Sequence, residues 1–178
     1  MENNLLPLVV YPDPKLQTEC AVITDYEPLE HIAGKMYELM KTAEGVGLAG
    51  NQIGLLHRIF VYEHENKKGI IINPQILKHE GQAASYEGCL SFPYCRFKVP
   101  RASKITMQYN TITGEEKTED FEGFIAVLFQ HETDHLNGLR IIDKTTAAEK
   151  QKHKKIIKVL EYHYEKQLEK LVDKKKET

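Results

Sequence analysis

The amino-acid sequence predicts an α+β fold, in which helices and short strands occupy separate stretches of the chain. Apolar residues recur at helical spacing over about residues 27–43 and again over 123–137. Between these two stretches, short segments rich in β-branched or alternating apolar residues predict several strands. A third helical stretch, rich in lysine, begins at about residue 146 and continues to near the end of the sequence.

The length and composition are those of a single globular domain. The chain has 178 residues, of which 41% are hydrophobic and 28% are charged. A net charge of −2 gives no indication of DNA binding, and no apolar run is long enough to predict a membrane span. The three cysteines form an odd set, and the first residues lack the basic region of a signal peptide. We therefore expect a cytoplasmic protein without a disulfide framework.

The N-terminal part predicts an irregular segment followed by a helix. Residues 1–24 contain the stretch YPDP, which is a turn signal. The helix over about 27–43 follows, with Asp25 as its expected cap. Its apolar stripe, which predicts the face packed on the core, consists of Leu29, Ile32, Met36, Leu39 and Met40.

The central part of the chain predicts strands separated by glycine-containing turns. The stretch AEGVGLAGNQIG contains four glycines between Gly45 and Gly54. The expected strands are RIFVYE (58–63), GIIINP (69–74), the alternating segment 103–109, and the return strand KTEDFEG after the turn NTITGEE. SYEGCLSFP, residues 85–93, predicts a turn because glycine and proline interrupt it.

The helix over 123–137 carries the pattern H-E-x-x-H within the stretch FQHETDHLNG. His131 and His135 are four residues apart, so they share one helical face and can bind a single metal ion. Glu132 lies beside them, where an acid and base is expected. The same face begins with the apolar residues of the helix, which predicts that both histidines are buried. Two surface histidines on a charged helix are the alternative.

Two histidines make an incomplete metal site, because a catalytic site usually has three protein ligands and one open position. The longer metalloprotease pattern requires a further histidine where this chain has Ile141. His153, His163 and the glutamates from Glu149 onward lie on a helix that its lysine content predicts to be exposed. Cys89 is a better candidate, because it lies in a glycine-framed turn and a thiolate is a strong ligand for zinc or ferrous iron. The alternative is a plain buried thiol, the role expected of the other two cysteines.

Three separated motifs together resemble the signature of the peptide deformylase family: GVGLAGNQIG (45–54), EGCLS (87–91) and QHETDHLNG (130–138). YPDPKL near the start, VPRAS at 99–103 and IIDK after the third motif add to the resemblance, which covers about residues 5–145. The resemblance implies a compact α+β domain with short antiparallel strands around the helix that carries the histidines. We expect this catalytic domain over residues 1–145 and a lysine-rich C-terminal helix over residues 146–178.

The resemblance also implies an activity, the removal of the formyl group from the N-terminal formyl-methionine of nascent polypeptides, with release of formate. It implies one divalent metal ion with three protein ligands, Cys89, His131 and His135. Glu132 is implied as the acid and base, and Gln52 and the backbone N–H of Leu90 as donors to the developing oxyanion. Ferrous iron is the ion that the resemblance favours, and Zn2+, Ni2+ or Co2+ can occupy the same donor set. Without the resemblance, Gln52 is equally well a surface amide.

Substrate selectivity is expected from an apolar slot for the methionine side chain, formed by Val46, Phe124, Val127 and Leu128. Plain core packing is the alternative for each of these residues. The glycine-framed segment around Gly47 is implied to bind the substrate backbone by strand addition.

Four further residues lie in or near the motifs. Glu87, Arg101 and Asp134 are expected to orient the ligands, with a surface ion pair as the alternative. Gly50 stands where the family commonly has alanine, which predicts extra backbone freedom beside Gln52.

The C-terminal segment differs in charge from the rest of the chain. Residues 145–178 contain ten lysines and six acidic residues, so their net charge is +4 (ten minus six). The resemblance implies a C-terminal helix that docks on ribosomal RNA, and a lysine-rich helix suits such a contact. A solvated helix packed on the domain is the alternative.

Two other functions compete with this prediction. A peptidase with the same metal site would cut internal peptide bonds, but the missing third histidine and the cysteine turn argue against it. A ribosome-associated binding protein with a relict site is the second competitor. The presence of all three candidate ligands and of Glu132 argues against that function.

Overall fold

The computed structural model describes the backbone of residues 6–176 and the side chains of residues 6–172. The helical elements are η1 (Pro14–Gln17), α1 (Leu29–Thr42), η2 (Gly50–Ile53), α2 (Gly123–Leu136), α3 (Ile141–Lys144), α4 (Ala147–Lys152) and α5 (Lys154–Lys176). The strands are β1 (Gly47–Ala49), β2 (Ile59–His64), β3 (Lys67–Glu80), β4 (Ala83–Cys89), β5 (Phe92–Arg101), β6 (Lys104–Asn110) and β7 (Glu116–Glu122). This arrangement confirms the predicted α+β fold.

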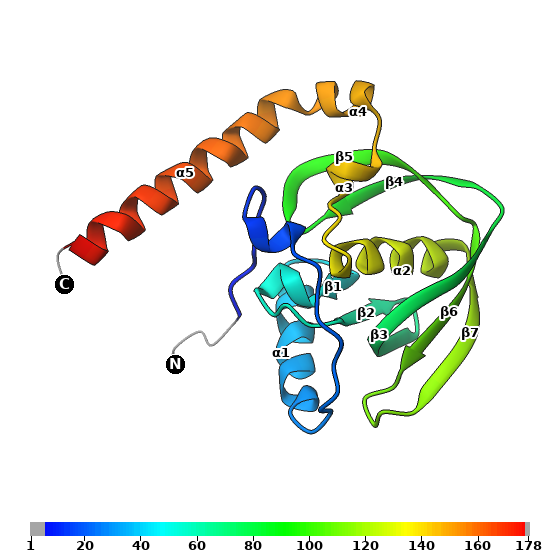
Figure 1. Cartoon of the computed structure of the whole chain (residues 1–178). Coiled ribbons are helices and arrows are strands. Elements are labelled where there is room, and N and C mark those ends of the chain that lie inside the picture. Colours follow the sequence, from blue (N-terminus) through cyan, green and yellow to red (C-terminus); the bar gives the residue numbers. More distant parts are fainter. Residues whose placement is uncertain (1–5, 177–178) are drawn as a thin grey trace.

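The strands form two antiparallel sheets. The larger sheet has the order β1-β2-β3-β6-β7, and β4 and β5 form a separate hairpin. Figure 1 shows α2 lying between the larger sheet and this hairpin. The helix that carries the two histidines is therefore surrounded by strands, as the family resemblance implied.

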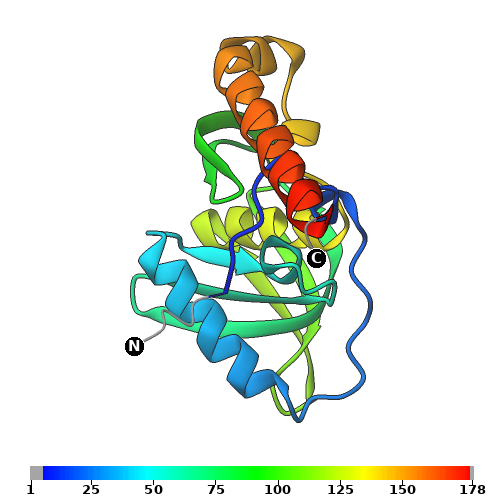
Figure 2. The same cartoon turned by 90° about the vertical axis from the view of Figure 1, so that its left-hand side faces the viewer.

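The alternating side chains of β2 explain how both faces of the larger sheet are covered. Ile59 and Val61 are fully buried in a cluster with the apolar residues of α1. Phe60 is buried in a second cluster with Phe129 of α2, and the two ring centroids are 5.2 Å apart. Because successive side chains of a strand point to opposite faces, α1 covers one face of the sheet and α2 covers the other (Figure 2).

The predicted first helix is confirmed, but it begins differently. α1 begins at Leu29, and the predicted apolar stripe is buried except for Ile32, which is half-buried. The prediction that Asp25 caps this helix is wrong, because the N-cap residue is Pro28. The Asp25 carboxylate instead accepts a hydrogen bond from the N–H of Glu27 in the preceding turn, at 3.2 Å.

Strand β3 is longer than the segment 69–74 that the sequence predicted. The strand pairs with β2 over its first half and with β6 over its second half. The register shifts between Ile72 and Gln75, where Asn73 has a φ of 51°. A bulge of this kind lets a strand continue past a residue that lacks an N–H, here Pro74.

The prediction of a turn over residues 85–93 is wrong, because most of these residues belong to β4 and β5. The chain reverses only at Leu90 and Ser91, and Cys89 pairs with Phe92 across the end of the hairpin. Gly88, one of the residues that predicted a turn, lies inside β4. The hairpin therefore presents Cys89 at its tip, on a pair of strands rather than on an irregular loop.

The chain after α2 forms three helices where the sequence predicted one. α3 was not predicted, and a break at His153 separates α4 from α5. The ring of His153 packs against Phe97, with the ring centroids 4.6 Å apart. This histidine is therefore partly buried, whereas the sequence predicted that it is exposed. Glu149 is also buried and forms an ion pair with Lys152. The expectation of an exposed helix is therefore wrong for its beginning.

The first half of α5 packs on the domain. Leu160 is buried in a cluster with Phe97, and the hydroxyl of Tyr11 donates a hydrogen bond to Glu161 at 2.9 Å. Figure 1 shows the second half of α5 extending away from the sheets. Leu168 and Leu171 on this part are exposed. Across residues 6–176, no helix is both long and apolar enough to cross a membrane.

Candidate active site

The two histidines of the H-E-x-x-H pattern lie on the buried face of α2. His131 is 7% exposed, His135 is fully buried, and their ring centroids are 5.0 Å apart. The predicted burial of both rings is confirmed. α2 starts abruptly at Gly123, whose φ of 61° is the left-handed conformation that glycine adopts without strain. This turn directs the chain from β7 into the space between the two sheets.

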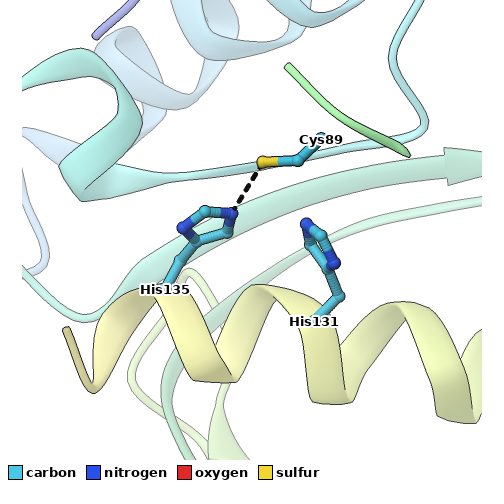
Figure 3. Close-up of side chains that lie close together, drawn as sticks. All are labelled: Cys89, His131 and His135. Atoms are coloured by element: carbon cyan, nitrogen blue, oxygen red, sulfur yellow. Dashed lines mark hydrogen bonds between the residues drawn. The ribbon is translucent and has the colours of Figure 1, made fainter. Parts of the chain in front are cut away.

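Cys89 lies across from the two histidines. Its Sγ is 3.2 Å from Nε2 of His135, and the ligand atoms of all three residues lie within 4.8 Å of one another. Figure 3 shows both imidazole rings pointing from α2 toward the sulfur. Cys20 and Cys95 are buried elsewhere and do not join this group.

The donor set fits a divalent metal ion. A thiolate and two imidazoles are ligands that zinc and ferrous iron accept, and three protein ligands leave one coordination position open. The ring of His131 is also oriented for this purpose, because its Nδ1 is hydrogen-bonded to Oε2 of Glu87 at 2.8 Å. Such a bond on one ring nitrogen leaves the other ring nitrogen free for a metal.

A buried network of charges supports His131 from behind. Glu87 receives two hydrogen bonds from Arg101, at 2.8 and 2.9 Å, in addition to the contact with His131. Arg101 also donates to Asp134 on α2, and Lys144 lies 3.5 Å from the other oxygen of that carboxylate. The side chain of Arg101 is only 3% exposed, which excludes the alternative of a surface ion pair.

The environments of the two imidazoles differ. Burial lowers the pKa of His135 well below its usual value, and the neighbouring charges of His131 and Arg101 act in the same direction. Burial also acts to lower the pKa of His131, but hydrogen bonds with Cys89 and Glu87 outweigh it and raise this pKa. His135 is therefore neutral, the form that binds a metal.

Glu132 lies beside this group and is 2% exposed. Its Oε2 has no hydrogen-bond partner among the described residues. Burial raises the pKa of Glu132 to about 7, against the opposing charge of His131. Gly47 on β1 faces the carboxylate: a β-carbon there would overlap Oε1 of Glu132 and would lie 2.8 Å from Cδ1 of Leu128. The glycine therefore makes room for the carboxylate at the edge of the sheet.

The side chain of Gln52 is held from both ends. Its Oε1 accepts the N–H of Ala49 at 2.9 Å, and its Nε2 donates to Oγ of Ser91 at 3.1 Å. The same Nε2 lies 3.6 Å from Sγ of Cys89. Gln52 is 1% exposed, so the alternative of a surface amide does not hold. Ser91 was not predicted to take part in the site, although it lies within the motif EGCLS.

Gly50 does not bring the backbone freedom that the sequence predicted. A β-carbon at Gly50 would lie 2.7 Å from the carbonyl oxygens of both Leu55 and His57. The neighbouring Asn51, which was not predicted to take part either, is fully buried and donates to the backbone carbonyl of His135 at 2.6 Å. The segment is therefore fixed by close packing, and glycine stands at this position because the backbone approaches too closely for a side chain.

A cleft of about 840 Å³ adjoins the candidate metal ligands. The five predicted substrate-binding residues all line it: Val46, Gly47, Phe124, Val127 and Leu128. Leu90, Gln52 and Glu132 line it as well. Tyr86 and Tyr94, which no motif singled out, add two exposed aromatic rings to the rim. The cleft thus joins an apolar wall to the polar residues around the candidate ligands.

This combination of groups is suited to breaking a bond with water. The structure brings together, beside one cleft, a thiolate and two imidazoles, a buried carboxylate whose Oε2 has no partner among the described residues, and an amide donor. The fold and the site therefore place the protein among the metal-dependent hydrolases.

Comparisons with known proteins narrow this class to one family. The model of the polypeptide deformylase family matches residues 5–151. A peptide deformylase of Acidobacterium capsulatum is 40% identical over 147 residues, which cover 79% of this chain and 86% of that protein. The crystal structure of the Plasmodium falciparum peptide deformylase has a TM-score of 0.87 at 34% identity, covering 89% of this chain and 97% of that one. The Thermotoga maritima structure has a TM-score of 0.78 at 38% identity, covering 80% and 98%.

The chain belongs to the polypeptide deformylase family. It is an enzyme that uses a catalytic metal to remove the formyl group from the N-terminus of nascent polypeptides.

Proposed function

We propose that Cys89, His131 and His135 bind the catalytic metal and that Glu132 transfers the protons of the reaction. The observation that carries this proposal is the convergence of the three ligand atoms within 4.8 Å, next to a buried carboxylate that lines the cleft. When bound, the metal would lower the pKa of a water molecule and polarise the formyl carbonyl.

Glu132 is suited to both proton transfers of deformylation. Its Oε2 has no partner among the described residues, so it is available to accept a proton from the attacking water. As the bond between the formyl carbon and the methionine nitrogen breaks, the same carboxyl returns that proton to the nitrogen. The products are then formate and a free N-terminal amine.

Gln52 and the backbone N–H of Leu90 are the proposed donors to the oxygen of the formyl group as it gains negative charge. The amide of Gln52 supports this role, because its Oε1 is fixed by Ala49 and its Nε2 is turned toward Cys89. Leu90 directly follows Cys89 and lines the cleft. Because the Gln52 amide is already fixed, it needs little reorganisation when charge develops on the formyl oxygen.

The apolar wall of the cleft is the proposed slot for the methionine side chain. Val127 and Leu128 are buried on α2, whereas Val46 and Phe124 are 40% and 48% exposed at the mouth. The backbone around Gly47 is the proposed site of strand addition by the substrate, because β1 is an edge strand of the larger sheet and Gly47 lines the cleft.

Ferrous iron is the proposed ion, because the family resemblance favours it. The donor set of one thiolate and two imidazoles also suits zinc, nickel or cobalt. The cytoplasm is the proposed location of the enzyme. Its three cysteines are all unpaired, which a reducing compartment favours.

The test of this function is formate release from formyl-Met-Ala-Ser by protein prepared without oxygen and loaded with ferrous iron. The acetylated peptide is the control, and protein loaded with zinc, nickel or cobalt gives the order of the metals. We expect turnover of the formyl peptide alone, with the iron form among the most active. Cleavage of internal peptide bonds, or the absence of formate release with all four metals, would contradict the proposal.

Replacing Gly47 with alanine is expected to lower kcat/KM for the formyl peptide by about 10²-fold, because a new methyl group displaces the Glu132 carboxylate. Gly34→Ala on α1 is the matched control, because a β-carbon at Gly34 meets no described atom within 4 Å. Formate release and thermal unfolding measure the two variants. Full activity of Gly47→Ala would show that the carboxylate does not need its present position.

We also propose a division into a catalytic domain, residues 1–145, and a lysine-rich helical segment, residues 146–178, that contacts ribosomal RNA. The described part of α5 supports this proposal through Lys158, Lys166 and Lys170, which are exposed and free of the domain core. Lysine neutralises phosphate charge, so such a contact weakens as salt increases.

Deleting residues 165–178 is expected to weaken co-sedimentation with ribosomes at low salt and to leave formyl-peptide turnover unchanged. The triple variant Lys158→Gln, Lys166→Gln, Lys170→Gln keeps the helix length and isolates the charge. We expect the slope of log affinity against log salt to fall by about one for each phosphate that a lysine no longer neutralises. Equal co-sedimentation of the full and shortened chains would overturn the ribosome contact without affecting the assignment of the site.

A further inference from the structure

Phe124 lies at an unusual place for a wall of a binding slot. It is the second residue of α2, directly after the left-handed Gly123, and it is 48% exposed. An aromatic ring at such a position has several open rotamers unless a neighbour restricts it. Selectivity for one side chain requires a wall that stays in one place. A wall formed by this ring would therefore need support from a neighbour outside the core.

His64 supplies that contact. The ring centroids of His64 and Phe124 are 4.1 Å apart and their planes are inclined by only 32°, which describes a tilted stack. The side chain of His64 is 29% exposed, so its neighbours, Phe124 among them, cover most of it. The one described acidic oxygen near this imidazole, on Glu65, is 3.8 Å from Nε2, too far for a hydrogen bond.

The end of β2 is a firm support for this stack. His64 pairs with Lys67 at the hairpin between β2 and β3, within the larger sheet. The preceding residue, Glu63, donates its backbone N–H to the carbonyl of Val46 at 2.9 Å. Val46 and Phe124 both line the mouth of the cleft. The last two residues of β2 thus hold two sides of that mouth, one through the backbone and one through a ring.

We propose that His64 is a positioning residue that fixes Phe124 as one wall of the methionine slot and thereby sets selectivity for the first side chain of the substrate. His64 is not among the described residues that line the cleft, so it acts through Phe124 and not by touching the substrate. The proposal rests on the proposed function, in which Phe124 forms part of that slot.

The test compares His64→Ala, His64→Phe and the unchanged enzyme, with formyl-Met-Ala-Ser and formyl-Ala-Ala-Ser as substrates. Loss of an aromatic pair is expected to raise KM for the methionine peptide about threefold to tenfold while kcat stays nearly constant. The preference for methionine over alanine falls by the same factor. His64→Phe keeps a ring in the stack, so it is expected to retain the KM for the methionine peptide and the preference for methionine of the unchanged enzyme. His79→Ala on β3 is the control, because His79 is exposed and is not among the described residues of the cleft.

Phe124→Ala separates this proposal from the proposed function. If Phe124→Ala leaves KM and selectivity unchanged, the slot itself is wrongly assigned. If Phe124→Ala raises KM but His64→Ala does not, only the role of His64 is overturned. A fall in kcat or in thermal stability without a change in selectivity, or a failure of His64→Phe to restore KM, also overturns it. In the Phe124→Ala background, His64→Ala is expected to have no further effect on KM.

Discussion

Replacing Glu132 with alanine is expected to lower kcat for formyl-peptide hydrolysis by about 10²–10⁴-fold, the range that general acid–base catalysis contributes. The physical reason is that Glu132 is a buried carboxyl that adjoins the candidate ligands and lines the cleft, and its Oε2 has no partner among the described residues, whereas Glu87 is bonded to Arg101 and His131. A water molecule in the space left by the side chain would be a far weaker base than a carboxylate. The measurement is formate release at saturating formyl-Met-Ala-Ser, with kcat and KM determined separately.

Metal content is the decisive control for this variant. The three candidate ligands are untouched by Glu132→Ala, so the ion bound per chain should equal that of the unchanged enzyme. Glu132→Gln keeps the shape of the side chain and removes only its ability to carry a proton, so it should be impaired to a similar degree. A variant that retains its metal and most of its kcat would show that another group moves the protons. Cys89→Ala supplies the contrasting case, in which metal and activity are lost together.

The predictions from sequence succeeded where a local pattern determines the structure. The period of the apolar residues located α1 and α2, and β-branched or alternating segments located β2 and β6. The same period correctly indicated that His131 and His135 lie on the buried face of α2. These features depend on the chain within a few residues, so the sequence contains the information directly.

The wrong predictions concern contacts between distant parts of the chain. Glycine and proline in residues 85–93 predicted a turn, but pairing between β4 and β5 overrides that local preference. Gly50 suggested looseness, yet the approach of the backbone at Leu55 and His57 makes the same glycine a tight fit. Likewise, the burial of Glu149 depends on the packing of α4 on β5. Such effects follow from the fold and cannot be found in a sequence window.

The supporting residues show the same division. The motifs brought Glu87, Arg101 and Asp134 into view, but the sequence left a surface ion pair open. Only the structure distinguishes residues that orient the ligands from a surface ion pair, because the burial of these side chains depends on how the hairpin of β4 and β5 lies over α2. Ser91 and Asn51 had no signal beyond their place inside motifs, since a serine or an asparagine in a turn has many local roles. Their hydrogen bonds to Gln52 and to the carbonyl of His135 appear only in three dimensions.

Replacing Arg101 with leucine is expected to lower the free energy of unfolding by about 3–5 kcal/mol, the usual effect of removing one partner of a buried ion pair. Arg101 makes two hydrogen bonds to Glu87 and one to Asp134, and its side chain is 3% exposed. Without the guanidinium, Glu87 remains buried with His131 as its remaining partner, and the partly buried Asp134 keeps only Lys144, which lies 3.5 Å away. Denaturant unfolding of the variant and of the unchanged enzyme measures this loss.

The same variant is expected to bind metal about 10- to 100-fold more weakly, because Glu87 orients the ring of His131 and loses its own support. Arg101→Lys restores a charge but not the two parallel bonds, so it should recover stability only in part. Lys104→Leu is the matched control: Lys104 is paired with Asp120 at 3.0 Å on the surface, and its loss should leave unfolding and metal affinity almost unchanged. If Arg101→Leu were as stable as this control, the network would not support the fold. If it lost stability but kept its metal affinity, Glu87 would hold His131 in place without help from the arginine.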